Sequence, residues 1–276
     1  MICFPHSKIN LGLHVTAKRP DGFHDLQTSF YPVKWCDALE VAEHPRGKKI
    51  EICITGLPVQ GQPEDNILYK AWLALNKEHH LPPLLVHLLK KIPMGAGLGG
   101  GSSDAAFFLE LLNKKFSLGI SEQQLFEIAS NLGSDCPFFL QKKPVLAGGR
   151  GNVFSPLDID LSTFYIMIVY PQVHSNTALA YAGVTPRAPV CNLADLLEKP
   201  VTAWKNLLLN DFEPHIFARF PVLDIIKKAL YRSGALYAAM SGSGSAIFGI
   251  YDKEPSPELP EQCVVFLQEP DPGKIL

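Results

Sequence analysis

The sequence predicts an α+β protein with two domains. Its 276 residues suffice for two hydrophobic cores of ordinary size. Hydrophobic residues make up 47 % and charged residues 19 %, which is a globular composition. Strand-like and helix-like segments follow one another in mixed order, without the strict alternation that a parallel α/β sheet requires.

Strands dominate the first third. In residues 8–15 apolar side chains alternate with other residues, which predicts a strand. The same reasoning predicts strands at residues 26–33, 38–41, 49–55 and, as a strand or short buried segment, 84–91. Helical periodicity predicts helices at 66–78 and 104–116. Ser121 and Gln124 fit a capping box, which predicts a helix from residue 121 to 132 that stops at Gly133.

A domain boundary is predicted at the glycine-rich stretch near residues 148–156, dividing the chain into domains 1–153 and 154–276. Beyond it we expect an apolar strand at 164–170 and a pair of strands at 235–240 and 246–251. Helices are predicted at 176–182, 202–219 and 222–233. A glycine-serine turn, residues 241–245, separates the last two strands.

Composition excludes several classes of function. The net charge is −2 and the basic clusters are only pairs, so we expect no nucleic-acid partner. The six cysteines are scattered without a C-x-x-C pair, which is typical of reduced thiols in the cytoplasm. No segment approaches the roughly 20 apolar residues that span a bilayer, and the start of the chain lacks signal-peptide features. We therefore expect a soluble, cytoplasmic protein without a membrane partner.

The most informative motif is a glycine-rich loop. Residues 95–100 match G-x-G-x-x-G, the pattern of a dinucleotide fold. A dinucleotide fold needs a second parallel strand after the following helix, and here Gly119 and another helix stand in that place. A Walker A loop ends in Gly-Lys-Ser/Thr, whereas this loop ends in Gly-Ser-Ser. Both of these interpretations fail on context.

A different phosphate cradle fits better. Closely spaced glycines let backbone N–H groups point inward, and the loop enters a helix that we expect to begin near Ser103. The first N–H groups of a helix lack partners and attract anions. Ser102 and Ser103 can donate to phosphate or ligate Mg²⁺. The alternative is a flexible turn with Ser102 as an ordinary N-cap, although a cap needs one serine and not five preceding glycines.

These residues carry a resemblance to a known family. Residues 93–106 resemble the central motif of the GHMP kinases, which include galactose, homoserine, mevalonate and phosphomevalonate kinases. Residues 7–13, 19–24, 27–28 and 133–138 resemble further segments of one branch of that family, and residues 241–245 resemble its third motif. The match runs from residue 7 to about residue 250 in the same order.

The resemblance implies a two-domain GHMP kinase fold, with a ribosomal protein S5 domain 2-like N-terminal domain and a ferredoxin-like C-terminal domain. It places the active site in the cleft between the domains. It implies transfer of the ATP γ-phosphate to a tertiary 2-hydroxyl of a methylerythritol linked to cytidine diphosphate, in the non-mevalonate isoprenoid pathway. It also implies ATP and Mg²⁺ as cofactors, with Mg²⁺ held mainly by ATP and Ser103 as a candidate ligand.

The resemblance also assigns roles to residues. Asp135 would take the hydroxyl proton, and Lys8 would lie beside it, hold its pKa low and stabilise the developing charge. The ATP-binding residues would be Asn66, Lys91, Pro93, Gly95, Gly97, Leu98, Gly99, Gly100, Gly101, Ser102 and Ser103. The residues that bind the cytidylyl substrate would be Asn10, Phe23, His24, His174, Gly242 and Ser243.

Structural alternatives remain open for several of these residues. Asp135 could serve only as a turn or N-cap aspartate, and Lys8 could be a surface lysine on an edge strand. Asn66 could equally cap its helix. Asn10 lies two residues after Lys8, so both side chains should leave the same face of a strand.

The substrate site has alternatives of its own. Phe23 would stack on cytosine and His24 would bond the edge of the base, or the two are a core aromatic and a turn histidine. The family often has tyrosine where Phe23 stands. His174, after Pro171, would face the nucleotide.

Asp104 would either cap its helix or assist a metal through water. We assign it no catalytic role, because a carboxylate near three phosphates is repulsive without Mg²⁺.

Two other functions compete with this hypothesis. One is another GHMP kinase of the homoserine or mevalonate type, which has no use for Phe23 and His24 as a base site. The other is a non-catalytic nucleotide-binding module, which does not require both Lys8 and Asp135. We expect a monomer or weak homodimer. Three prolines in residues 253–261 stand where the family leads us to expect a longer helix, so the last element is uncertain.

Overall fold

The structure, a computed structural model, describes residues 1–47, 49–59, 61–189, 191–271 and 273. The chain forms two compact units whose segments interleave along the sequence. Unit 1 comprises Met1–Ser7, Lys34–Met94 and Gly99–Lys142, and unit 2 comprises Lys8–Val33, Gly95–Leu98 and Lys143–Leu276. The division predicted at residue 153 stays a prediction.

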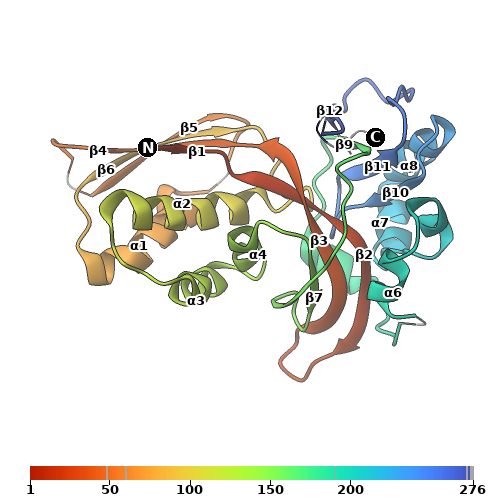
Figure 1. Cartoon of the computed structure of the whole chain (residues 1–276), viewed down its shortest axis with the longest axis horizontal. Coiled ribbons are helices and arrows are strands. Elements are labelled where there is room, and N and C mark those ends of the chain that lie inside the picture. The colour runs from red at the N-terminus through yellow and green to blue at the C-terminus, as the bar shows by residue number, and fades with distance from the viewer. Residues whose placement is uncertain (48, 60, 190, 272, 274–276) are drawn as a thin grey trace. The chain divides into compact units, whose positions relative to one another are not determined.

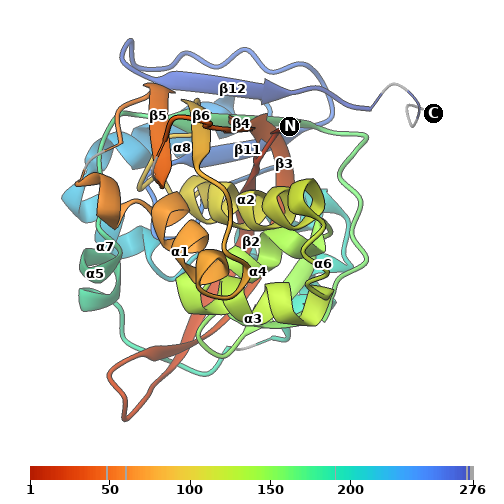
Figure 2. The same cartoon turned by 90° about the vertical axis from the view of Figure 1, so that its left-hand side faces the viewer.

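Unit 1 is a four-stranded sheet covered by helices. Its strand order is β1 (Ile2–Cys3), β4 (Ala38–Glu43), β6 (Leu84–Lys90) and β5 (Ile50–Gly56). Among the described strands of this sheet, the β5–β6 pair is parallel and the other pairs are antiparallel. The helices are α1 (Ile67–His79), α2 (Gly100–Phe116), α3 (Glu122–Leu132) and α4 (Cys136–Gln141), with a 3₁₀ turn η1 (Pro63–Asp65). Figure 1 shows α1 and α2 on one face of this sheet, and Figure 2 shows the four helices grouped together.

The helices of unit 1 begin where the local chemistry satisfies their first N–H groups. Asn66 caps α1 by accepting from the Leu68 N–H at 2.9 Å. Ser121 and Gln124 form the predicted capping box of α3. Helix α2, however, begins at Gly100, four residues before the predicted start. An added Cβ at Gly100 would come within 2.8 Å of the Ile92 side chain, so the first turn needs glycine to pack closely.

Unit 2 contains two sheets. The first has the order β2 (His6–Lys18), β3 (His24–Cys36), β7 (Val145–Gly148) and β8 (Val153–Pro156), and the ends of β2 and β3 at residues 6–7 and 34–36 belong to unit 1. The second has the order β10 (Tyr237–Met240), β11 (Ile247–Tyr251), β9 (Tyr165–Tyr170) and β12 (Val264–Gln268), all antiparallel.

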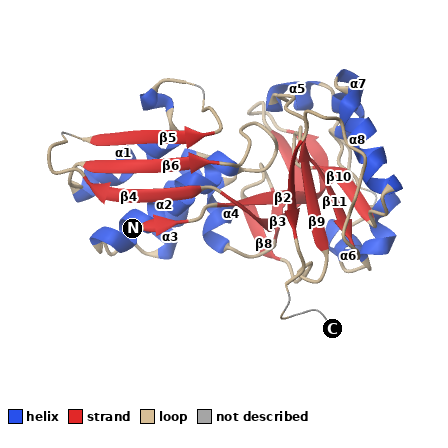
Figure 3. Cartoon of the chain, turned by 90° about the horizontal axis from the view of Figure 1, so that it is seen from above, coloured by secondary structure: helices blue, strands red, loops and turns tan. Residues whose placement is uncertain are grey.

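Unit 2 also contains the helices α5 (Thr177–Ala182), α6 (Leu193–Leu197), α7 (Glu213–Arg219) and α8 (Pro221–Arg232), with a 3₁₀ helix η2 (Val201–Asn206). Of these, α8 and η2 pack against its second sheet. The apolar face of α8, with Leu223, Ile226 and Leu230, shares a core with Met240 and Ile247 of the sheet. Figure 3 shows α7 and α8 flanking β10 and β11.

One predicted helix was wrong, and several strands were not predicted. The helix predicted at 202–219 is a 3₁₀ helix, an irregular stretch from residue 207 to 212 and then α7. Strands β7 and β8, which pair across the glycine-rich stretch near residues 148–156, were not predicted. Strand β12 follows the three prolines and pairs with β9, so the last element, which the sequence left uncertain, is a strand. No helix of the described residues has both the length and the hydropathy that crossing a membrane requires.

Candidate active site

Lys8 lies in a buried chain of polar side chains in unit 2. Its Nζ donates to Asn10 Oδ1 at 2.6 Å, and Asn10 Nδ2 donates to Thr28 Oγ1 at 2.9 Å. Thr28 in turn donates to the Gly12 carbonyl at 2.6 Å. Lys8 is 3 % exposed and Asn10 is 2 % exposed. Lys8 and Asn10 therefore share a face of β2, as predicted, and Lys8 is not a surface lysine. A buried ammonium needs such partners because desolvation penalises its charge.

The second glycine turn (residues 241–245) packs directly on this chain. Ser241 Oγ donates to the Gly97 carbonyl at 2.8 Å and accepts from the Asn10 N–H at 3.3 Å. An added Cβ at Gly242 would lie 3.2 Å from Asn10 Oδ1. Unit 2 thus brings together Lys8, Asn10, Gly97 and Gly242, which lie far apart in the sequence.

The first glycine loop (residues 95–101) requires glycine for two reasons. Gly95, Gly97 and Gly99 have φ values of 65°, 76° and 72°, in the left-handed region that disfavours other residues. An added Cβ at Gly97 would also collide with the Ser241 carbonyl oxygen. The Lys8 N–H donates to the Leu98 carbonyl at 3.0 Å. The loop backbone is therefore fixed by both β2 and the second glycine turn.

His174 lies against the first glycine loop. A Cβ added at Gly95 would collide with the His174 ring. The next residue, Ser175, is bonded to the second glycine turn, because its Oγ donates to the Ser243 carbonyl at 2.8 Å. The His174 imidazole is therefore next to the loop that carries the proposed ATP site. Its predicted contact with the nucleotide stays a prediction.

The chain passes into unit 1 at Gly99, which is the N-cap residue of α2. Gly99 has no side chain and the first turn of α2 has no acidic residue, so its N–H groups have no side-chain cap. Ser102 is therefore not the N-cap, and that alternative was wrong. Ser103 is fully buried, and its Oγ has no hydrogen-bond partner in the described part of the chain. A helix start with these properties can bind an anion.

Behind this helix start lies a buried ionic cluster of unit 1. Lys90 Nζ donates to Asp37 Oδ2 at 2.5 Å and to Asp104 Oδ2 at 2.7 Å. Asp37 Oδ1 also accepts from the Ile92 N–H at 2.8 Å. Burial raises the pKa of Asp104 to about 7. Asp104 thus joins α2 to the end of β6 and does not cap α2. Its other predicted role, assisting a metal through water, stays a prediction.

Asp135 stands at the N-cap of α4, but its side chain makes no capping hydrogen bond. Ser134 Oγ lies 3.5 Å from Asp135 Oδ1. A Cβ added at Gly133 would lie 3.9 Å from Ser102 Oγ, and Ser102 is hydrogen-bonded to the thiol of Cys136. Residues 133–136 therefore lie against the start of α2. Asp135 and Lys8 belong to different units, so their pairing stays a prediction.

The predicted base site contains aromatic contacts within unit 2. The His24 ring stacks on Tyr181 of α5, with centroids 4.8 Å apart and an angle of 18°. Phe23 is 50 % exposed, and the Arg150 guanidinium lies 3.4 Å from its ring centroid. Phe23 is therefore not a core aromatic. Its predicted stacking on cytosine stays a prediction.

The remaining predicted ATP residues lie in unit 1. Asn66 acts as a helix cap, which leaves its second predicted role open. Lys91 is exposed and its N–H donates to Asp37 Oδ1 at 2.5 Å, while Pro93 is buried. The structure thus shows Asn66 and Lys91 in hydrogen bonds that fix the local backbone, and their roles in ATP binding stay predictions.

Comparison with known proteins identifies the family. Residues 66–143 match the GHMP kinases N terminal domain, and residues 192–263 match the GHMP kinases C terminal. The chain belongs to the GHMP kinase family. This GHMP kinase has the α+β fold that the sequence predicted.

The most informative relatives of this GHMP kinase share one name. A 4-diphosphocytidyl-2-C-methyl-D-erythritol kinase of Bacteroides thetaiotaomicron is 50 % identical over 262 residues, covering 95 % of each chain. The protein of the same name from Parabacteroides distasonis is 50 % identical over 255 residues, covering 92 % of each chain. These relatives match nearly the whole of this GHMP kinase.

Solved structures agree with this grouping. A crystal structure of 4-(cytidine 5′-diphospho)-2C-methyl-D-erythritol kinase matches with a TM-score of 0.77 at 32 % identity, covering 91 % of this chain and 90 % of that one. A homoserine kinase from Cytophaga hutchinsonii matches with a TM-score of 0.64 at 18 % identity, covering 94 % of each chain. At that identity the second match supports the fold alone.

Sequence reasoning missed several residues around the site. Tyr181 and Arg150 carry no local signature and are found only through their contacts with His24 and Phe23. Lys90 belongs to one of the basic pairs of the sequence, which indicates a surface residue, but it is fully buried. Asn210 and Glu213 fell inside a segment predicted to be helical. Their polar side chains lie close together in an otherwise apolar pattern, and this was the sequence feature that could have indicated a structural role for them.

Proposed function

We propose that this GHMP kinase transfers the γ-phosphate of ATP to the 2-hydroxyl of 4-diphosphocytidyl-2-C-methyl-D-erythritol. The relatives that match it at about 50 % identity over 92–95 % of the chain carry the name of that kinase. Kinases named for homoserine or mevalonate match at only 12–18 % identity. The proposal includes a cytoplasmic enzyme that acts as a monomer or weak homodimer.

The position of Asp135 near the start of α2 is the observation that supports the proposal most directly. Residues 133–136 lie against Ser102 at the start of α2, where uncapped N–H groups favour an anion. Asp135, whose side chain does not cap its own helix, belongs to that segment. A carboxylate held next to a phosphate-binding helix start suits proton removal, whereas a binding module has no need for it.

The reaction balances with these residues. The acceptor hydroxyl oxygen forms a bond to the γ-phosphorus, the bond from that phosphorus to the β-phosphate oxygen breaks, and ADP leaves. Asp135 takes the hydroxyl proton in our proposal. Lys8 stabilises the negative charge that develops on the transferred group, and the Asn10 amide keeps the Lys8 ammonium in place.

The first glycine loop and α2 would hold the ATP phosphates. Backbone N–H groups at residues 95–101 and at the start of α2 supply donors, and Ser102 and Ser103 add hydroxyl groups. We further propose that Mg²⁺ accompanies ATP. The buried, unpartnered Ser103 Oγ is an oxygen donor of the kind this ion prefers. When bound, the ion neutralises phosphate charge.

The acceptor site would lie in unit 2. Gly242, Ser243 and Asn10 would meet the polar part of the acceptor, with His174 beside them. His24 would bond the edge of the cytosine, and its stacking on Tyr181 fixes the plane of its ring. Phe23 offers an exposed face for stacking on the base. A substrate without a nucleobase would leave these aromatic groups unused.

An acceptor screen tests the proposal. Purified enzyme is incubated with ATP, Mg²⁺ and one of three alcohols: the cytidylyl methylerythritol, mevalonate or homoserine. ADP release is measured. We expect turnover with the cytidylyl acceptor and only background with the other two. Turnover with mevalonate or homoserine but not with the cytidylyl acceptor would overturn the proposed function.

A further inference from the structure

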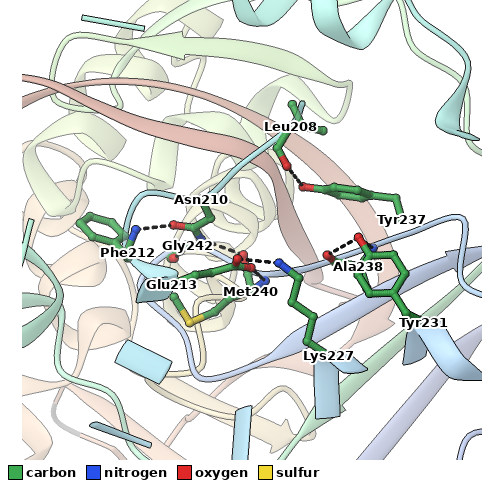
Figure 4. Close-up of polar contacts among 10 residues, drawn as sticks. All are labelled: Leu208, Asn210, Phe212, Glu213, Lys227, Tyr231, Tyr237, Ala238, Met240 and Gly242. Atoms are coloured by element: carbon green, nitrogen blue, oxygen red, sulfur yellow. Dashed lines mark hydrogen bonds and ion pairs between the residues drawn. The ribbon is translucent and has the colours of Figure 1, made fainter. Parts of the chain in front are cut away.

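The segment from residue 209 to residue 213 joins separate parts of unit 2. It runs beside β2, where the Leu13 N–H donates to the Leu209 carbonyl at 2.9 Å and the Asp211 N–H donates to the Leu13 carbonyl at 2.9 Å. These bonds hold residues 209–212 in a non-helical conformation where sequence periodicity predicts a helix. Within it, the Asn210 and Glu213 side chains reach the end of β10 and the second glycine turn (Figure 4).

Asn210 fixes the backbone of that turn. Its Nδ2 donates to the Met240 carbonyl and to the Gly242 carbonyl, both at 2.8 Å. Its Oδ1 accepts from the Phe212 N–H at 3.0 Å. Asn210 is 4 % exposed, and all its side-chain hydrogen-bonding groups are used. A buried amide with two donors directed at two carbonyls sets their positions.

Glu213 binds the N–H of Met240, the last residue of β10. Its Oε1 accepts from the Met240 N–H at 2.8 Å, and its Oε2 pairs with Lys227 Nζ at 2.6 Å. Both peptide groups of Met240 are thus bonded to this one segment, the N–H to Glu213 and the carbonyl to Asn210. The turn leaves β10 from a fixed starting point.

The same segment also supports the aromatic contacts. The Phe212 ring meets Tyr181 edge to face, with centroids 4.9 Å apart and an angle of 78°. Tyr181 stacks on His24 through its own ring. The second glycine turn is joined to the start of α5 as well, since Ser243 Oγ lies 3.2 Å from Thr177 Oγ1. A continuous chain of contacts therefore runs from Asn210 to His24.

We propose that Asn210, Phe212 and Glu213 are positioning residues for the acceptor site. Asn210 and Glu213 set the second glycine turn, and Phe212 sets the Tyr181–His24 stack, so one segment aligns the polar and the base-binding parts of the site. This inference rests on the proposed function, because it takes Gly242, Ser243 and His24 as acceptor contacts. It assigns no catalytic step to the three residues.

The first test is Asn210→Asp. The substitution keeps the size and the acceptor for Phe212 but removes both donors and places a carboxylate oxygen against two carbonyls. We expect the KM for the cytidylyl acceptor to rise at least about tenfold, as for the loss of two buried hydrogen bonds. The KM for ATP should stay within about threefold, because the first glycine loop keeps its bonds from the Lys8 and Ala246 N–H groups.

A second variant keeps the test decisive if the first fails to fold. Phe212→Leu leaves the Asn210 bonds intact and removes the ring edge against Tyr181. We expect the acceptor KM to rise roughly three- to tenfold, the range for loss of one aromatic pair, with kcat and the ATP KM unchanged. Asn192→Asp is the matched control, because this exposed asparagine caps α6 through its oxygen and keeps that bond as aspartate.

The outcomes separate the two proposals. If wild-type enzyme phosphorylates the cytidylyl acceptor, and folded Asn210→Asp or Phe212→Leu raises only the acceptor KM, the inference holds. Two results with an active wild-type enzyme would overturn the positioning role and leave the proposed function standing. In the first, both folded variants keep the wild-type KM for the acceptor. In the second, the KM for ATP rises by the same factor as the KM for the acceptor. If the wild-type enzyme does not use this acceptor, the proposed function fails first.

Discussion

Gly97 is a residue whose side-chain hydrogen cannot be replaced. Its φ is 76°, and an added Cβ would collide with the Ser241 carbonyl oxygen. We expect Gly97→Ala to raise the KM for ATP by at least tenfold, because the first glycine loop must move away from the second turn. Kinetics at varied ATP concentration measure this effect.

Gly119 provides the matched control for that substitution. It has a similar φ of 71°, but an added Cβ meets nothing within 4 Å. Gly119→Ala therefore carries the backbone strain without the collision. Equal KM values for ATP in the two variants would show that packing on Ser241 is unimportant.

Asp135 carries the proposed proton transfer. We expect Asp135→Asn to lower the rate of ADP release with the acceptor by roughly 10²-fold or more, as for loss of a positioned base. ATP binding, measured by calorimetry, should be retained, because the phosphate donors lie in the loop and in α2. Asp252→Asn, at an exposed aspartate, is the control. Wild-type turnover in Asp135→Asn would remove Asp135 from the mechanism.

His6 makes the stability of unit 1 sensitive to acid. Its ring lies 5.4 Å from the ring centroids of both Phe107 and Phe139, and burial lowers the pKa of His6 below the ordinary value of 6.5. As the pH falls below about 6.5, the His6 imidazole is therefore protonated in the unfolded chain before it is protonated in the folded chain. The free energy of unfolding should fall as the pH drops through that range, and His6 should not affect its pH dependence above it.

The substitution His6→Phe tests this effect. We expect the variant to lose less stability than wild type between pH 6.5 and pH 5, as measured by urea unfolding. His87→Phe, at an exposed histidine on β6, controls for removal of an imidazole. Parallel pH profiles for wild type and His6→Phe would contradict the assignment.

At the scale of elements, Lys90 joins the end of β6 to the first turns of α2. The Lys90 ammonium is fully buried between Asp37 and Asp104. Lys90→Met would leave two carboxylates buried without their cation, which we expect to cost about 3–5 kcal/mol of unfolding free energy. Denaturant unfolding of the variant measures this cost.

The exposed Lys143 serves as the control for that experiment. Lys143→Met removes a lysine of the same length, so its unfolding free energy should stay within about 0.5 kcal/mol of wild type. A Lys90→Met variant as stable as Lys143→Met would mean that the cluster contributes nothing to joining β6 and α2.

Local signals predicted some elements well. Helices α1 and α3 begin at side-chain caps that the sequence displays, and β9 is a continuous apolar run between turns. The predicted helix at 202–219 failed because the bonds of Leu209 and Asp211 to Leu13 of β2 override local periodicity. Strand β12 was missed because its pairing partner, β9, lies about a hundred residues earlier in the chain.

The same distinction holds for the site. Glycine spacing, the Lys8–Asn10 pair and the motif around Asp135 are visible in sequence because their residue types are restricted locally. Tyr181, Asn210 and Glu213 acquire their roles only through contacts with distant segments. The placement of such residues requires the tertiary structure.

At the scale of the whole molecule, the matches to the GHMP kinases span both parts of the sequence. Many acceptors are served by one fold, as the 18 % identical homoserine kinase illustrates, so fold alone does not choose the acceptor. The proposed acceptor rests on the relatives that match 92–95 % of the chain and on the aromatic side chains of Phe23, His24 and Tyr181.

The position of the transferred phosphate tests the central claim most directly. The product formed from ATP and 4-diphosphocytidyl-2-C-methyl-D-erythritol is isolated and examined by phosphorus and carbon NMR. We predict one new phosphate ester, with phosphorus–carbon coupling at the tertiary carbon that bears the 2-hydroxyl. An ester on another hydroxyl, or no ester from folded enzyme that hydrolyses or binds ATP, would contradict the account.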